Sequence, residues 1–379
     1  MLQSAFVYIA LMLIMFLLSV LSISVYKDKN SILTPFTLIA IVLFSVVFGF
    51  RYNVGLDHIA YIKNYLLTQA GGHAKEYEPF FKLITNFFAE EGFHYGFYFS
   101  FIAFIQILFT FKAFKNYAYI LPSFCLILFL GEYALNWMNG VRQCLAICVF
   151  YYALRFLEYR NLKKLIYYVF WVLIASLFHK SALLLLLLVI FNWREKPLFS
   201  NPKILISIYV LFFIFANNYA ASLWENYSSI FTELGYWSYD VDFDEIDRGR
   251  TTKVATGIGV FLALINNIVL IIVNKKVKSF YNSRYLNLVF DLYYISILFA
   301  CIFGTIVITG RINMYFSFLG LILQSFTLYY FYKNCKTKLN IALFSVFLLI
   351  KVALFSNSIY KGAENLTEYH YITETPFQL

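Results

Sequence analysis

Three arginines stand at the ends of apolar runs, where their charge is costly. Arg51 closes one run, and Arg142 and Arg311 each open another, in every case near a glycine and polar amides. A guanidinium at the centre of a membrane costs ~2.5–3.5 kcal/mol on insertion scales, and less near the interface. A single arginine of this kind is usually an interfacial anchor, whereas three of them favour a shared polar cavity.

The chemistry that suits such a cavity is the binding of a phosphorylated ligand. A guanidinium is a planar, permanently charged fork, and a diphosphate matches its geometry. Arg142 and Arg311 also lie at predicted helix N-termini, where the macrodipole and free N–H groups favour anions. The three arginines therefore predict a diphosphate site.

Three further side chains could move protons or bind hydroxyl groups. His179 lies between two short apolar runs, and an imidazole with its near-neutral reference pKa can serve as a general base, although a lone histidine is often structural. Asp57 could pair with Arg51, bind substrate hydroxyls or act as the base. Glu78 could bind hydroxyls or be a solvated carboxylate.

The elements that carry these residues are predicted to be membrane helices. The chain has 379 residues, of which 61% are apolar and only 13% charged, and its mean hydropathy is +0.72. A soluble protein has about a quarter of its residues charged, so a soluble enzyme, an extracellular module and a disordered scaffold are excluded. The apolar runs are unbroken, whereas barrel strands alternate over about ten residues. The fold class is therefore an all-α polytopic membrane protein.

The apolar runs predict about twelve transmembrane helices within a single integral membrane domain, residues 1–379. They are 4–26, 33–50, 95–111, 118–135, 141–157, 165–178, 181–193, 204–224, 254–273, 285–303, 312–332 and 339–357. When the loops are sorted alternately, one side holds most of the basic residues and few acids. The positive-inside rule places that side in the cytoplasm, so both termini face outward.

Two outward loops are long. Loop 51–94 is expected to hold short amphipathic helices, and loop 225–253 is acidic. The acidic run 240–247 fails as an EF-hand, because the required Gly and Glu are replaced by Glu245 and Thr251. A solvated loop is the better interpretation.

Other chemistries lack their sequence signatures. The chain has no Walker A loop and no Gly-rich nucleotide fingerprint. Its five cysteines form no C-x-x-C pair, and we interpret them as small buried hydrophobic residues. The net charge of +10 is concentrated in the predicted cytoplasmic loops rather than in a nucleic-acid-binding patch. We expect no cofactor, no metal and no nucleic-acid partner.

An ordered set of short motifs resembles one family. The set comprises R-Y-x-x-G-x-D-x-x-x-Y from residue 51, E-P-F-F from 78, N-G-V-R-Q-x-L-A from 139, F-H-K-S-A from 178 and G-R-I-N-M-Y-F from 310. In this order they resemble the EpsG family of Wzy-like polysaccharide polymerases, over residues 45–320. The resemblance implies a bacterial inner-membrane protein, a GT-C-like helical fold and a polyprenyl-diphosphate-linked glycan as substrate.

The resemblance gives the candidate residues their expected roles. Arg51, Arg142 and Arg311 would bind the diphosphate, and His179 would be the acceptor base, with Asp57 as second candidate. The residues expected to bind sugars are Glu78, Asn139, Gln143, Asn313 and Tyr315. The expected reaction joins undecaprenyl-diphosphate-linked oligosaccharide repeats on the outer face of the bacterial inner membrane, with membrane lipids and a chain-length regulator protein as further partners. A flippase for the same lipid-linked oligosaccharide, or an O-antigen ligase, are the alternatives.

Overall fold

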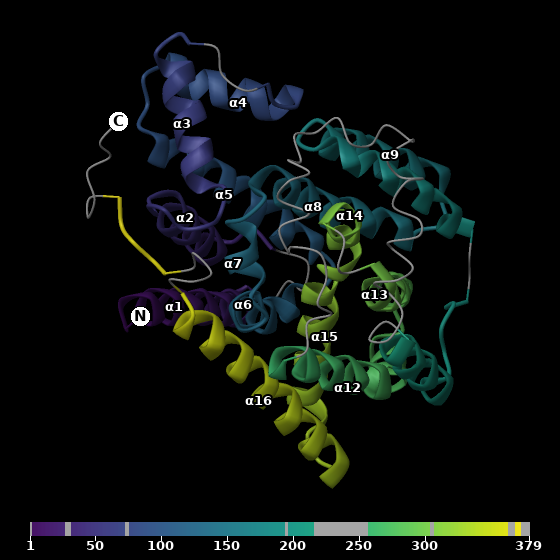
Figure 1. Ribbon diagram of the computed structural model, residues 1–379. Helices are drawn as coiled ribbons and strands as arrows, with labels where there is room; N and C mark the ends of the chain where they lie inside the picture. Colours follow the sequence, from purple (N-terminus) through teal and green to yellow (C-terminus); the bar gives the residue numbers. More distant parts are fainter. Residues whose placement is uncertain are drawn as a thin grey trace. The chain divides into compact units, whose positions relative to one another are not determined.

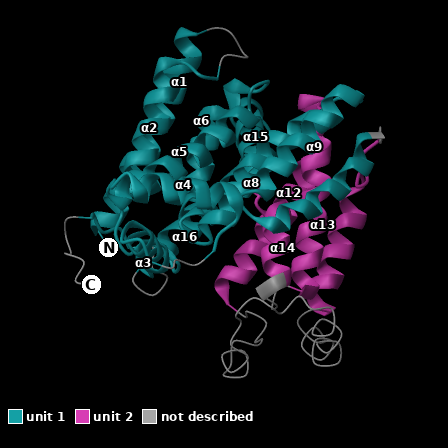
Figure 2. Cartoon of the chain, turned by 90° about the horizontal axis from the view of Figure 1, so that it is seen from above, with its two compact units in different colours: residues 1–195, 321–379 teal, residues 196–320 magenta. Residues whose placement is uncertain are grey.

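The computed structural model describes residues 2–26, 32–72, 76–193, 196–215, 257–303, 307–362 and 368–372. The chain forms two compact units, shown in separate colours in Figure 2: residues 1–195 with 321–379 are unit 1, and residues 196–320 are unit 2. Apart from one isolated bridge between Arg51 and Tyr371, the regular structure of these described ranges is helical. This confirms the all-α prediction. The acidic loop 225–253 lies outside the described residues.

Unit 1 holds most of the helices (Figure 1). In chain order they are α1 (Leu2–Val25), α2 (Pro35–Gly49), α3 (His58–Gln69), α4 (Pro79–Glu90), α5 (Tyr95–Ala113), η1 (Ala118–Ile120), α6 (Leu121–Leu130), α7 (Tyr133–Trp137), α8 (Val141–Leu154), η2 (Arg155–Glu158), α9 (Leu162–Ser176), η3 (Lys180–Trp193), α15 (Gly320–Asn334, from its second residue) and α16 (Lys338–Tyr360). Unit 2 holds a helix at Pro202–Phe215, α12 (Ile258–Tyr281), α13 (Arg284–Phe303) and α14 (Val307–Ser317).

Helix α8 is a central element of unit 1. Every residue in it is buried except Arg142 and Tyr152, and it packs against α5 and α9. A helix that is apolar all round belongs in a core. Arg142, in its first turn, therefore projects from an element fixed on every side.

The end of α2 is held equally closely. Thr34 caps its N-terminus in a capping box with Thr37, and Pro35 takes the first helical position, where no N–H is needed. At the other end, a Cβ on Gly49 would overlap Ser100 of α5. Small residues of this kind let membrane helices approach closely. The chain therefore leaves α2 for the candidate site from a fixed point.

Six helices in the described ranges are long and apolar enough to cross a membrane. They are Leu2–Val25, Tyr95–Ala113, Ile258–Tyr281, Arg284–Phe303, Thr309–Asn334 and Lys338–Tyr360. Each of the twelve apolar runs falls on helical residues in its described part, but the remaining runs give helices too short for this criterion. The multi-pass character is confirmed. The count of twelve and the GT-C-like topology stay predictions.

The first and last described segments lie together in unit 1. The backbone N–H of Tyr369 donates to Ser4 Oγ at 2.9 Å, and backbone hydrogen bonds attach residues 368–372 to the residues that follow α2. Residues near Ser4 and residues 368–372 are thus on the same side of this unit. That this side faces outward stays a prediction.

Candidate functional site

The site begins where the turn after α2 meets the N-terminus of α8. Asn139 Oδ1 accepts a hydrogen bond from Leu56 N at 2.6 Å, and Asp57 Oδ2 accepts one from Gly140 N at 3.1 Å. These bonds join segments 83 residues apart in the chain. Asp57 also places its carboxylate at the start of α8, where the helix dipole favours negative charge. Two predicted site residues, Asp57 and Asn139, therefore lie together and clamp the two main chains.

Gly55 permits this close approach. Its φ is +99°, and a Cβ there would overlap the carbonyl oxygen of Met138. A side chain would therefore meet both a left-handed backbone and a steric clash. The glycine of the motif that begins at Arg51 is required for docking rather than for chemistry.

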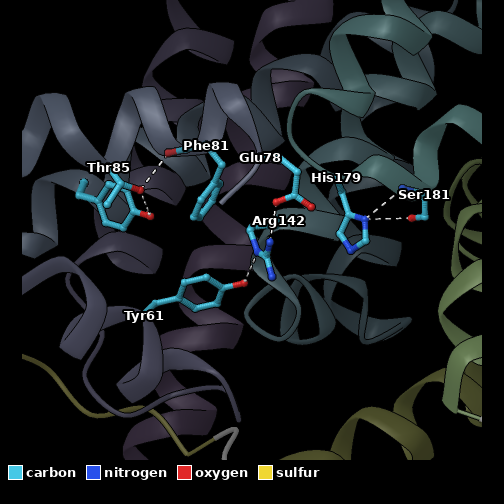
Figure 3. Close-up of polar contacts among 8 residues, drawn as sticks. Tyr61, Glu78, Phe81, Thr85, Arg142, His179 and Ser181 are labelled. Carbon is cyan, nitrogen blue, oxygen red and sulfur yellow. Dashed lines mark hydrogen bonds and ion pairs between the residues drawn. The ribbon is translucent and has the colours of Figure 1, made fainter. Parts of the chain in front are cut away.

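Arg142 lies just beyond the clamp, in a cluster of polar and aromatic side chains (Figure 3). One terminal nitrogen donates to Glu78 Oε2 at 2.5 Å, and Nε donates to Tyr61 Oη at 3.3 Å. The guanidinium carbon lies 5.0 Å from the centre of the Tyr77 ring, a cation–π arrangement. The Arg142 side chain keeps 23% of its surface exposed, against 6% for Glu78. Its charge is therefore oriented from within the protein and still reaches the surface.

The two tyrosines had no assigned role in the sequence analysis. Tyr61 is the last residue of the first motif, and its place there could have indicated a role. Tyr77 lies outside the motifs, immediately before Glu78. Burial raises the pKa of Tyr61, and the nearby charge of Arg142 offsets part of this shift. The phenol therefore stays protonated and presents its oxygen to Arg142 as an acceptor.

His179 is attached to the same cluster through the start of α4. The backbone N–H of Phe80 donates to Leu177 O at 3.1 Å, and the rings of Phe80 and Phe178 are 5.7 Å apart. In the view of Figure 3 the imidazole lies between Glu78 and Ser181, with Nδ1 directed to Ser181. Its Nδ1 lies 3.0 Å from Ser181 Oγ and 3.4 Å from Ser181 N. The motifs around residues 51, 78, 139 and 178 therefore converge within unit 1.

Arg51 belongs to unit 1 but is engaged differently. Only 3% of its surface is exposed. Its guanidinium donates to the carbonyls of Phe48 and Val54 and lies over the Phe99 ring. Burial lowers the pKa of Arg51 to about 10. The visible contacts of this arginine shape the turn after α2, and its predicted diphosphate contact remains a prediction.

His58 is a buried residue that the sequence analysis did not single out. It follows the clamp residue Asp57, its surface is fully buried, and its ring packs on Phe99 at 4.7 Å between centroids. Neither ring nitrogen has a hydrogen-bond partner among the described residues. Burial and then the charge of Arg51 lower the pKa of His58 well below its usual value, so the ring is neutral.

The remaining predicted residues have no described contact with the Arg142 cluster. Arg311 is exposed on α14 in unit 2, whereas Arg142 belongs to unit 1. The cavity that these two arginines were expected to share stays a prediction. Asn313 and Tyr315 on the same helix are buried, and Asn313 Nδ2 donates to Ser296 O at 3.1 Å. Gln143 is buried in α8. The sugar contacts of these three residues stay predictions.

A comparison with known families gives one match. The family model described as the EpsG family matches residues 34–372, nearly the whole chain. This range includes every residue placed in the site above. Neither a curated protein nor a solved structure matches the chain.

Proposed function

The chain belongs to the EpsG family, whose members are Wzy-like polymerases, and we propose that it joins lipid-linked oligosaccharide repeats into a polysaccharide. The donor is a growing glycan on undecaprenyl diphosphate, and the acceptor is a hydroxyl of the next lipid-linked repeat. The reaction takes place on the outer face of the bacterial inner membrane. A nucleotide is not required, because the diphosphate is the leaving group.

The observation that carries the proposal is the environment of Arg142. Glu78 and Tyr61 fix one edge of the guanidinium, and the side chain is still partly exposed. An arginine held in this way is preorganised for charge that develops on an oxygen as its bond breaks. The proposed role of Arg142 is to bind the donor diphosphate and stabilise its growing charge, together with Arg311 and Arg51.

The transfer itself moves one glycosyl group and one proton. The C–O bond between the sugar and the diphosphate breaks, and the acceptor oxygen forms the new C–O bond. The acceptor proton passes to His179. For this step the imidazole must be the tautomer whose Nδ1–H donates to Ser181 Oγ, so that Nε2 carries the lone pair. The other tautomer, in which Nδ1 accepts from the Ser181 N–H, has its proton on Nε2 and cannot act as the base there. Undecaprenyl diphosphate leaves.

Replacement of Arg142 tests the proposal. Arg142→Ala should reduce polymerisation on the order of 10²–10³-fold, as loss of a preorganised charge contact does. Arg142→Lys should restore little, because an ammonium lacks the bidentate fork. The measurement is the length distribution of glycan on gels, made in membranes that contain the lipid-linked repeat. The matched control is Arg160→Ala, an exposed arginine beyond the other end of α8.

The same gels separate the alternatives. A polymerase that is lost leaves single repeats, a lost flippase leaves no surface glycan, and a lost ligase leaves polymer on undecaprenyl diphosphate. Normal polymer length in Arg142→Ala would remove this arginine from the site and the proposal would lose its main support.

A further inference from the structure

Helix α4 presents three different faces along its length. The first is buried, the second is polar and outward, and the third is apolar although it is exposed. Residues on each face recur at a spacing of three or four, the period of one helical turn. In this order the faces contain Phe81, Thr85 and Ala89; Lys82, Asn86 and Glu90; and Leu83 and Phe87.

The buried face accounts for the attachment of α4 to unit 1. Thr85 Oγ1 lies 3.0 Å from Tyr98 Oη, and the Phe81 and Tyr98 rings are 6.1 Å apart. The apolar face lies away from this packing, and its ring contacts are those of Phe87 with Phe88 and Phe93. Leu83 is 65% exposed and Phe87 is 55% exposed. Singly exposed apolar residues are ordinary, but an apolar stripe beside a polar stripe is typical of a helix that lies in a membrane interface.

The apolar face continues onto a membrane-spanning helix. The Phe87 ring lies 6.4 Å from Phe93, and Phe93 lies 6.4 Å from Phe97 in the first turn of α5. Phe88 reaches one turn further, to Phe101, at 5.4 Å. Helix α5 is one of the helices long and apolar enough to cross a membrane, and Phe97 and Phe101 are exposed on it. The exposed rings of α4 thus extend the exposed apolar surface of a candidate membrane-spanning helix.

We propose that α4 lies flat in the membrane surface, with Leu83 and Phe87 in contact with phospholipid hydrocarbon. The occupant is lipid rather than a protein because the face is continuous with the exposed aromatic side of α5, a helix long and apolar enough to cross a membrane. The adjoining polar face fits the water side, where Lys82 forms an exposed ion pair with Glu76 at 3.5 Å. Helix α4 is then an interfacial anchor within the segment 51–94. This inference does not depend on the polymerase reaction.

The placement has a consequence for the site. Glu78 immediately precedes α4 and contacts Arg142. An anchored α4 would hold that contact at the level of the lipid headgroups, which is where the diphosphate of any lipid-linked molecule must lie.

Photocrosslinking in vesicles tests the inference. The full-length protein is reconstituted in phosphatidylethanolamine and phosphatidylglycerol vesicles, with benzoylphenylalanine at position 87 or, separately, at position 83. Illumination inserts the benzophenone into nearby C–H bonds, and mass spectrometry identifies the adducts. Position 101 on α5 is the positive control, and position 82 on the polar face of the same helix is the matched negative control.

We expect phospholipid adducts at 83 and 87 in a yield close to that at 101 and several-fold above that at 82. Lipid adducts at 101 without adducts at 83 and 87 would overturn the inference. Adducts of 83 and 87 to polypeptide instead of lipid would also overturn it, because a protein partner or a second copy would then cover the face. Two separate sites guard against a local disturbance at either one.

Discussion

Arg142 and Arg51 are the same residue type beside the same loop, but their surroundings differ. Arg142 has a carboxylate partner, a phenol and an aromatic face, and keeps part of its surface exposed. Arg51 is buried and donates to main-chain carbonyls. Glu78 is buried, and the cost of desolvating its charge offsets most of what the ion pair gains, so the Arg142–Glu78 contact serves orientation more than folding. A diphosphate ligand would therefore bind to a guanidinium whose orientation is already fixed.

Glu78 was expected to bind sugar, and its visible contact is with Arg142. The two roles are compatible, since a carboxylate has two oxygens and the ion pair uses Oε2. Its second oxygen is directed by the same contact. The prediction that Glu78 binds a sugar hydroxyl is therefore retained beside a positioning role for Arg142.

Replacement of His179 should impair proton transfer and leave substrate binding intact. His179→Ala is expected to lower turnover by ~10²–10⁴-fold, the usual worth of a positioned base. His179→Gln should be as inactive, because an amide can hold the Ser181 contact but takes no proton at neutral pH. Binding of the lipid-linked donor should survive in both variants, measured by equilibrium binding to protein in detergent.

Ser181→Ala is the matched control for the orientation of the ring. It removes Oγ, the closer of the two Ser181 contacts with Nδ1, and should reduce turnover less than the loss of the imidazole does. Near-normal polymerisation in His179→Gln would show that the ring is structural. Asp57 would then become the leading base.

At the scale of elements, the docking of the turn after α2 onto α8 positions the site. Gly55→Ala should disrupt it, because the new Cβ overlaps Met138 O in addition to the left-handed strain at φ +99°. Gly71→Ala has a similar positive φ of +72° but no atom within 4 Å of the new Cβ. It should cost only the backbone strain, about 1–2 kcal/mol. Thermal unfolding in detergent should therefore show a larger loss of stability for Gly55→Ala than for Gly71→Ala. Equal losses would mean that the turn tolerates movement away from α8.

The helices and the segments that form the site could largely be predicted from the sequence, but the contacts between those segments could not. Long apolar runs predict helices because burial in lipid leaves the backbone few other ways to satisfy its hydrogen bonds. Motif order predicted which segments matter, and four of them do meet in unit 1. The sequence did not reveal that Asp57 accepts from the backbone of Gly140 and Asn139 from that of Leu56, because such contacts depend on the angle between two segments. The same holds for Tyr77, whose role comes from its ring lying beneath Arg142.

At the scale of the whole molecule, the charge distribution and the structure both bear on which side of the membrane the candidate site faces. The N–H of Tyr369 bonds to Ser4, so the first and last described segments share one side of unit 1. The loop charges predict an even number of crossings with both termini outward. The segment that carries Asp57 and Glu78 follows α2 on the side where the termini lie. The side of the candidate site therefore depends on the side of the termini.

Labelling with a membrane-impermeant thiol reagent on intact cells decides this orientation. A cysteine introduced at Asp242, in the predicted outward acidic loop, should react, and so should one at Gly71, at the end of α3. A cysteine at Lys276, exposed near the predicted cytoplasmic end of α12, should react only after the membrane is opened. The unmodified chain gives the background of its own five cysteines, of which Cys125, Cys144 and Cys148 are buried. If Lys276 were labelled and Asp242 protected, the positive-inside assignment would be inverted. The cluster around Arg142 would then face the cytoplasm, where polymerisation of an exported repeat has no place, and a reaction on the inner face would have to replace it.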